Sequence, residues 1–235
     1  MSSPLLAIGM AECKLLLRNK TVAVSATLLP LLMGAYLGLM RPGEGAWGVT
    51  VALQLMAVLG FTVYFTSCTA LTSRREDLYL KRLCSAEPAP VVVLAGLLFP
   101  VVVLGIVQSA VMLAIAAALG APVVPGLPMI AVAVVGGLLT CLAAGAATSG
   151  RTSTAEQAQI TTLPFFFLLF GGAVWAAAST SWFALLLPGG AVGYLTGRAM
   201  SGDLSGVGPA LLSLVVWVAV AAAAARSWFR WEPRG

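Results

Sequence analysis

Hydrophobic residues run in long, nearly unbroken stretches along this chain, and short polar segments that hold most of the charges separate them. Six stretches approach or exceed the roughly 20 residues that an α-helix needs to cross the hydrocarbon core of a bilayer. They comprise residues 21–40, 50–73, 90–120, 128–148, 160–178 and 209–225. Backbone amides must be hydrogen-bonded within lipid, which favours helices over isolated strands. The pattern therefore predicts an all-α integral membrane protein with six transmembrane helices.

Two further apolar segments do not fit a simple crossing. Residues 1–20 would place apolar side chains on one face of a helix and basic side chains on the other, which predicts a cytoplasmic interfacial helix. The alternative is a charged flank of the first crossing. Residues 183–194 are apolar but short, and Pro188, Gly189 and Gly190 interrupt them. They predict a re-entrant or interfacial piece, so that a broken hairpin joins the fifth and sixth helices.

The composition leaves no room for a second, water-soluble domain. Hydrophobic residues make up 60% of the 235 residues and charged residues only 9%, whereas a soluble domain carries about 25% charged residues. We therefore expect two parts. Residues 1–20 form a connecting helix, and residues 21–235 form a six-helix membrane domain with a cytoplasmic loop at residues 74–90.

The distribution of lysine and arginine predicts the orientation in the membrane. With the amino terminus in the cytoplasm, only Arg41 and Arg198 of the 13 basic residues fall outside. The positive-inside rule favours this arrangement, with both termini in the cytoplasm and the chain in the plasma membrane. The net charge of +5 then reflects topology and contact with membrane lipid, not nucleic acid. The cytoplasmic group comprises Lys14, Arg18, Lys20, Arg74, Arg75, Lys81, Arg82, Arg151, Arg226, Arg230 and Arg234.

The chain lacks the side chains on which most membrane enzymes and pumps depend. It has no histidine, no G-x-x-x-x-G-K-[ST] motif and no charged residue in the middle of any predicted helix. Histidine is the commonest metal ligand and general base, the motif cradles nucleotide phosphates, and buried charges serve ion-coupled transport. We therefore expect no catalytic residue, metal site or cofactor in this chain. Energy for uphill transport would come from another subunit.

The cytoplasmic loop after the second stretch has an unusual pattern. Ser73 and Glu76 stand at the spacing of a helix-capping box, three leucines and Tyr79 follow, and a Glu-Pro-Ala-Pro sequence ends the segment. A loop that only reverses the chain needs no apolar residues. The pattern therefore predicts a short helix that docks on a partner or lies on the bilayer surface. The alternative is a solvated basic loop without a partner.

The order of features here is charged residues, then a leucine-rich turn, then a proline-containing start of the third helix. In this order the chain resembles the permease subunits of type 2 ATP-binding-cassette (ABC) exporters. The resemblance implies that the loop is a coupling helix, which sits in a groove of a cytoplasmic ATPase. The family's common glycine after the acidic pair is absent, and Leu78 follows Asp77 instead. By position, the ATPase-coupling residues would be Arg75, Glu76, Leu78, Tyr79, Lys81, Arg82 and Leu83.

The same resemblance implies partners and cargo. The chain would work as a homo- or heterodimer with a second permease copy and with a separate ABC ATPase, which would hold ATP and Mg²⁺. It would export a hydrophobic drug, lipid, natural product or peptide. Two other classes stay open: a non-transporting membrane scaffold or immunity subunit, and an ion-coupled secondary transporter. The lack of charge within the predicted helices disfavours the transporter.

Aromatic and polar side chains on the second and fifth helices are candidates for a substrate path, although helix packing or lipid contact explains such residues as well. Glycines spaced by four residues predict close approach of helices, including at a dimer interface. The path candidates are Gln54, Phe61, Tyr64, Phe65, Thr161, Phe165 and Trp175. The packing glycines are Gly34, Gly38, Gly189, Gly193 and Gly197.

Overall fold

The computed structural model describes residues 9–10, 20–40, 42–43, 45–76, 90–122, 126–179 and 181–229. Within these ranges the chain is helical and forms no β-strand, which confirms the predicted all-α class. The elements are α2 (Lys20–Leu39), α3 (Trp47–Ala57), the π-helical η1 (Val58–Phe65), α4 (Thr66–Glu76), α6 (Pro90–Ala118), α7 (Leu127–Ser149), α8 (Ala158–Thr161), α9 (Leu163–Ala178), the 3₁₀-helical η2 (Trp182–Leu186), α10 (Gly190–Ser201) and α11 (Gly208–Trp228).

Five helices among the described residues are long and apolar enough to cross a membrane. They are Trp47–Glu76, Val92–Ala118, Leu127–Ser149, Ala158–Ala178 and Gly208–Trp228. The apolar segment Ala26–Leu39 of α2 is shorter, although the 20 residues of α2 would extend about 30 Å. The count of six crossings therefore stays a prediction.

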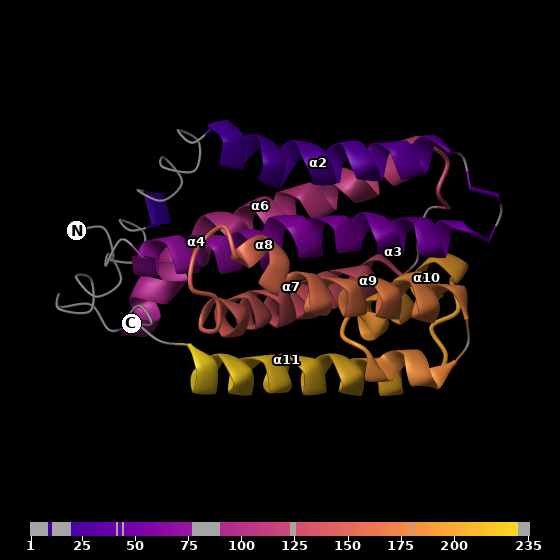
Figure 1. Ribbon diagram of the computed structural model, residues 1–235. Helices are drawn as coiled ribbons and strands as arrows, with labels where there is room; N and C mark the ends of the chain where they lie inside the picture. The colour runs from indigo at the N-terminus through magenta and orange to yellow at the C-terminus, as the bar shows by residue number, and fades with distance from the viewer. Residues whose placement is uncertain are drawn as a thin grey trace, which may run out of the picture.

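The long helices lie side by side along a common direction (Figure 1). The continuous helix formed by α3, η1 and α4 is the central one. Of its apolar membrane-spanning segment, 78% is buried inside the protein, against 17% for α11. Around it pack α2, α6, α7, α9 and α10, while α11 packs mainly on α7. Any shift of the central helix must therefore be accommodated by most of the bundle, because close-packed interiors do not deform continuously.

The segment between α9 and α11 turns back through two short helices, η2 and α10. Leu187, Pro188 and Gly189 separate them, and Gly189 has φ +86°, a conformation that favours glycine. The 12 residues of α10 extend only about 18 Å, which is too short for a crossing. Instead α10 packs against α9, α3 and α7, so this part of the predicted hairpin is built into the bundle.

A proline in α2 creates a hydrogen-bonding site inside the bundle. Pro30 has no N–H, so the carbonyl of Ala26, four residues earlier, lacks its partner within the helix. Gln108 Nε2 of α6 donates to this carbonyl at 3.1 Å. The hydroxyl proton of Thr62 in η1 is shared between the same carbonyl, at 2.8 Å, and Gln108 Oε1, at 2.5 Å. Three helices are therefore joined at one main-chain oxygen.

We expect the Thr62→Val variant to lose roughly 1 kcal/mol of stability, because the interhelical bonds of its hydroxyl would disappear without much change in volume. Thr69→Val is the matched control, since Thr69 Oγ1 bonds only to the carbonyl of Phe65 in its own helix, at 2.9 Å. Thermal unfolding of both variants in detergent measures the difference. If both variants lose the same stability, the interhelical bonds of the Thr62 hydroxyl contribute no more than a bond within one helix.

Candidate functional site

The cytoplasmic end of α4 carries the first two candidate coupling residues, Arg75 and Glu76. The second apolar stretch was expected to end at residue 73, but the helix continues to Glu76. Ser73 therefore lies inside α4, and the helix N-terminal cap predicted there is wrong. Basic side chains in the last turn suit the negative end of the helix dipole, and Arg74 and Arg75 occupy that turn.

Arg75 is one of the largest fully buried side chains, with 2% of its surface exposed. Its guanidinium donates a hydrogen bond to the carbonyl of Thr152, in the segment 150–157 that connects α7 to α8. In the same segment, the Ala155 N–H donates to Glu76 Oε2 at 2.9 Å. Two adjacent residues of α4 thus hold this segment, which we name the α7–α8 loop.

The α7–α8 loop is fixed to further helices at the same end of the bundle. Thr152 Oγ1 bonds to the Thr148 carbonyl at the end of α7 and lies 2.8 Å from Thr161 Oγ1 in α8. The Arg151 guanidinium lies 3.6 Å from the centroid of the Trp228 ring, at the end of α11. Figure 1 shows the ends of α4, α7 and α11 on the same side, with α8 beside α4. One loop therefore links four helices.

The other predicted coupling residues, and most of the predicted connecting helix, lie outside the described residues. This applies to Leu78, Tyr79, Lys81, Arg82 and Leu83 and to residues 1–8 and 11–19. Of the connecting segment, Gly9 is described; it is buried, and a Cβ added there would lie 2.9 Å from a ring carbon of Phe99 in α6.

Aromatic rings of η1 and α9 meet at two neighbouring places, which together we name the aromatic seam. The rings of Tyr64 and Phe165 lie 4.9 Å apart between centroids, and those of Phe61 and Phe166 lie 4.7 Å apart. Phe170 stacks on Phe166 at 4.5 Å. The sequence predicted three of these five residues and missed Phe166 and Phe170. In the run of three phenylalanines at 165–167, the sequence does not say which ring faces the neighbouring helix.

The remaining path candidates do not join the seam. Gln54 is fully buried between helices, where its Nε2 donates to the carbonyl of Gly34 at 2.8 Å. Its Oε1 has no hydrogen-bond partner among the described residues. Phe65 is half-buried, and Thr161 and Trp175 are exposed. Their role in a substrate path therefore stays a prediction.

The predicted packing glycines all lie at helix contacts within the chain. A Cβ added at Gly193 in α10 would lie 2.6 Å from Ala173 Cα in α9. A Cβ at Gly189 would likewise overlap the Leu169 backbone of α9, whereas one at Gly197 would lie in ordinary contact with Ala177, 3.5 Å from its Cα. In α2, a Cβ at Gly34 would lie 2.8 Å from Met112 Cε, and one at Gly38 would lie 2.7 Å from Leu119 Cδ1. The glycines of α10 let its backbone approach that of α9, and those of α2 leave room for the side chains of Met112 and Leu119. Close approach of helices is the common role of such glycines in membrane proteins.

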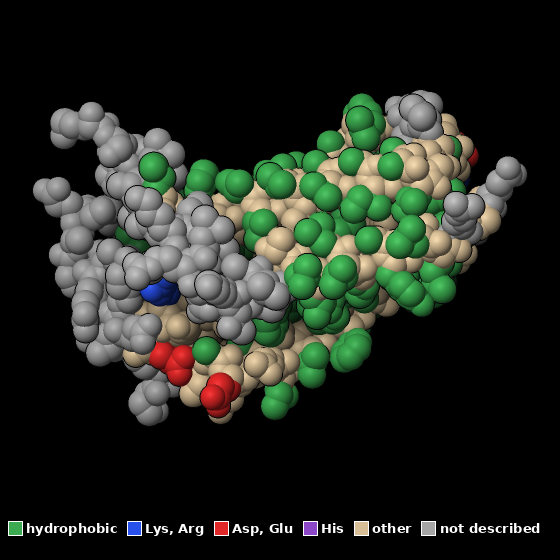
Figure 2. Space-filling model, turned by 90° about the horizontal axis from the view of Figure 1, so that it is seen from above, with side chains coloured by type: hydrophobic (Ala, Val, Ile, Leu, Met, Phe, Trp, Pro, Cys, Tyr) green, Lys and Arg blue, Asp and Glu red, His purple; other side chains and the backbone are tan. Residues whose placement is uncertain are grey.

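Hydrophobic side chains cover the long face seen in Figure 2, and the visible charged side chains lie towards its ends. The outward side chains include Leu32 at 59% exposure, Phe167 at 66% and Val215 at 65%. Such a broad apolar surface is typical of contact with lipid or with another membrane subunit. Among the described residues, no group of three His, Cys, Asp or Glu could hold a metal ion.

In a comparison with known protein families, the model of the ABC-2 type transporter family matches residues 4–188. The chain belongs to the ABC-2 type transporter family. It is a multi-pass ABC permease, as the charged and leucine-rich loop predicted. No curated protein and no solved structure matches it. The matched region of the permease contains both the α7–α8 loop and the aromatic seam, and it ends at the turn before α10.

Proposed function

We propose that the permease exports hydrophobic cargo with energy from a separate cytoplasmic ABC ATPase, which binds ATP and Mg²⁺. The observation that carries this proposal is the pair of contacts from Arg75 and Glu76 to the α7–α8 loop. In the proposed assembly, residues 77–89 contact the ATPase directly after these two anchors. A push on that segment then acts on α4 and on the α7–α8 loop together.

The proposed movement passes from α4 into the aromatic seam. The α7–α8 loop continues into α8, and α8 leads into α9, which carries Phe165 and Phe166. Thr152 bonds to Thr161 within this connection, so the loop and the start of α9 move as one piece. A displacement of α9 relative to η1 would change the seam and switch access to the cargo between the two sides of the membrane.

We infer a hydrophobic cargo and a second permease copy from the side chains inside the helix bundle. In the described helices, charged side chains occur only in the end turns, so the permease offers no ionic partner to a charged cargo in mid-membrane. Gln54 and Tyr64 are fully buried between helices. We therefore place the pathway between two copies, with a drug, lipid, natural product or peptide of apolar character as cargo.

The test is ATP-driven transport in reconstituted vesicles. The permease is purified with the ATPase that copurifies with it, and inverted vesicles are supplied with ATP, Mg²⁺ and a hydrophobic fluorescent dye. We expect accumulation of the dye that stops when the ATPase is inhibited by vanadate. Accumulation driven by an ion gradient in vesicles of permease alone would contradict the proposal, and retention of the dye without ATP would favour a scaffold.

The proposed orientation predicts which positions are reached from outside the cell. Cysteines introduced at Gly43 and Leu204 should react with a membrane-impermeant maleimide, because both residues are exposed. They lie in the connections from α2 to α3 and from α10 to α11, at the end of the bundle opposite to α4 (Figure 1). Gly206 is less suitable, since its φ of +70° strains a side chain. The native Cys84 should react only after permeabilisation. Labelling of Cys84 in intact cells would reverse the topology.

A further inference from the structure

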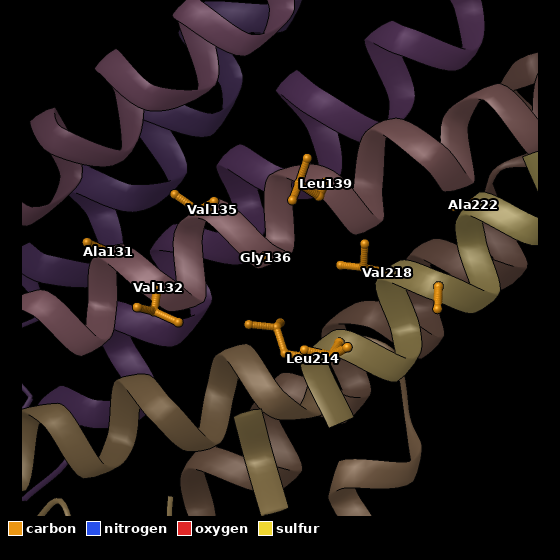
Figure 3. Close-up of a pocket in the computed structure, with 10 residues that line it drawn as sticks. Ala131, Val132, Val135, Gly136, Leu139, Leu214, Val218 and Ala222 are labelled. Atoms are coloured by element: carbon orange, nitrogen blue, oxygen red, sulfur yellow. The ribbon is translucent and has the colours of Figure 1, made fainter. Parts of the chain in front are cut away.

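An open apolar groove runs between α7 and α11 on the outside of the bundle (Figure 3). Its volume is about 590 Å³, within the range of pockets that hold drug-sized ligands. Leu214 lies against Gly136, where an added Cβ would be 2.8 Å from Leu214 Cδ1. This close crossing sets the bottom of the groove, while small residues on both helices leave the space beside it unfilled. The lining comprises Ala131, Val132, Val135, Gly136, Leu139, Leu214, Val215, Val218, Ala219 and Ala222.

The chemistry of the groove limits what can occupy it. All the lining side chains are aliphatic, apart from the glycine. The nearby hydroxyl of Ser213 is already used, since it donates to the carbonyl of Leu185 at 2.6 Å. A peptide or sugar would therefore lose hydrogen bonds on entering. The groove lies between two helices that are long and apolar enough to cross the membrane. The apolar molecules around such helices are bilayer lipids, so we take an acyl chain as the ligand.

Basic side chains stand at one end of this groove. Arg226 is four residues beyond Ala222 and seven beyond Ala219 in α11, so it lies on the same helix face. It is exposed, and it forms no hydrogen bond or ion pair with the described part of the chain. Arg151 lies over Trp228 at the same end of the two helices. A guanidinium suits the oxygens of a phosphodiester, which it can bind through two N–H groups.

We propose that the groove between α7 and α11 is a binding site for one anionic phospholipid, with an acyl chain along the groove and the headgroup phosphate at Arg226 and Arg151. The lipid would fill the space between a peripheral helix and the rest of the bundle. α11 is the least buried of the five long helices, at 17%. This proposal does not depend on the ATPase or on the direction of transport.

The test is lipid retention by the purified, detergent-solubilised permease, measured by native mass spectrometry during titration with phosphatidylglycerol or phosphatidylcholine. We expect one tightly held phosphatidylglycerol per chain. Arg226→Gln should weaken its binding about fivefold, and Arg226→Lys should keep most of it because the charge remains. Ala219→Phe should weaken retention of either lipid, because its ring would obstruct part of the groove.

Val220→Phe is the matched control for Ala219→Phe, because Val220 is 50% exposed on α11 but does not line the groove. Both variants are first checked for a single symmetric peak in size-exclusion chromatography. Equal retention of the two lipids by the native chain, or equal retention by the two phenylalanine variants, would overturn the proposal. So would a loss of dimer in Ala219→Phe alone, since a second copy would then occupy the groove.

Discussion

The Gly193→Leu variant is expected to lose the native packing of α10 and to unfold at least several degrees below the native chain. A Cβ at this position would lie 2.6 Å from Ala173 Cα and would overlap the Ala173 carbonyl. Backbone atoms cannot move aside as a flexible side chain can, so the two helices must separate. Overpacking of this kind costs about 1–3 kcal/mol or more, and α10 also carries contacts to α3 and α7.

Gly171→Leu provides the control on the neighbouring helix. Gly171 lies in α9, and a Cβ added there meets nothing within 4 Å. The same substitution should therefore leave the unfolding temperature close to that of the native chain. Thermal unfolding in detergent and the yield of monodisperse protein measure both variants. If they unfold alike, the contact between α9 and α10 is not the close approach described above.

The second large effect is expected at Glu76. Glu76→Ala removes the acceptor of the Ala155 N–H and should lower dye transport about threefold or more, since an exposed charged contact contributes up to about 1 kcal/mol. ATP hydrolysis by the assembled complex should continue, because the substitution leaves the ATPase itself unchanged. The measurement is the ratio of dye transported to ATP hydrolysed in the same vesicles.

Two further variants separate coupling from simple damage. Glu76→Gln should retain most of the coupling, because its amide oxygen can accept the same N–H. Glu156→Ala removes an exposed carboxylate of the same loop, for which no side-chain contact is found within the described residues, and should change nothing. The proposed role of Glu76 would be contradicted if Glu76→Ala kept the native ratio of dye transported to ATP hydrolysed. It would also be contradicted if Glu156→Ala lowered that ratio equally.

The long apolar helices were predictable because hydrocarbon dictates both their length and their composition. The expected crossing at residues 128–148 corresponds to α7 (Leu127–Ser149), and the fifth corresponds to α8 and α9. The end of the second helix was placed three residues early, because Arg74 and Arg75 interrupt the hydrophobic pattern. Arg75 nevertheless stays buried, since its partner is the carbonyl of Thr152, 77 positions away. No local pattern contains such a contact.

The aromatic seam was only partly predictable for a different reason. Which side chains share a face of the second helix is judged from the sequence with 3.6 residues per turn. The element η1 is instead π-helical over Val58–Phe65, and its wider turn changes which side chains share a face. Tyr64 is fully buried and meets Phe165, while Phe65 is only half-buried. On the fifth helix the path candidate Trp175 lies on the outside, with 44% of its surface exposed.

On α2, the interhelical hydrogen bonds are accepted by the main chain, so substitutions of its side chains do not remove the acceptors. Both carbonyls that receive them, those of Ala26 and Gly34, belong to the peptide chain itself. Alanine scanning along α2 therefore leaves every acceptor in place, and even replacing Pro30 would restore an amide without removing the oxygen. The polar part of this attachment is encoded in the donors Gln54, Thr62 and Gln108 on the neighbouring helices. On α2 itself, the sensitive positions are the packing glycines Gly34 and Gly38.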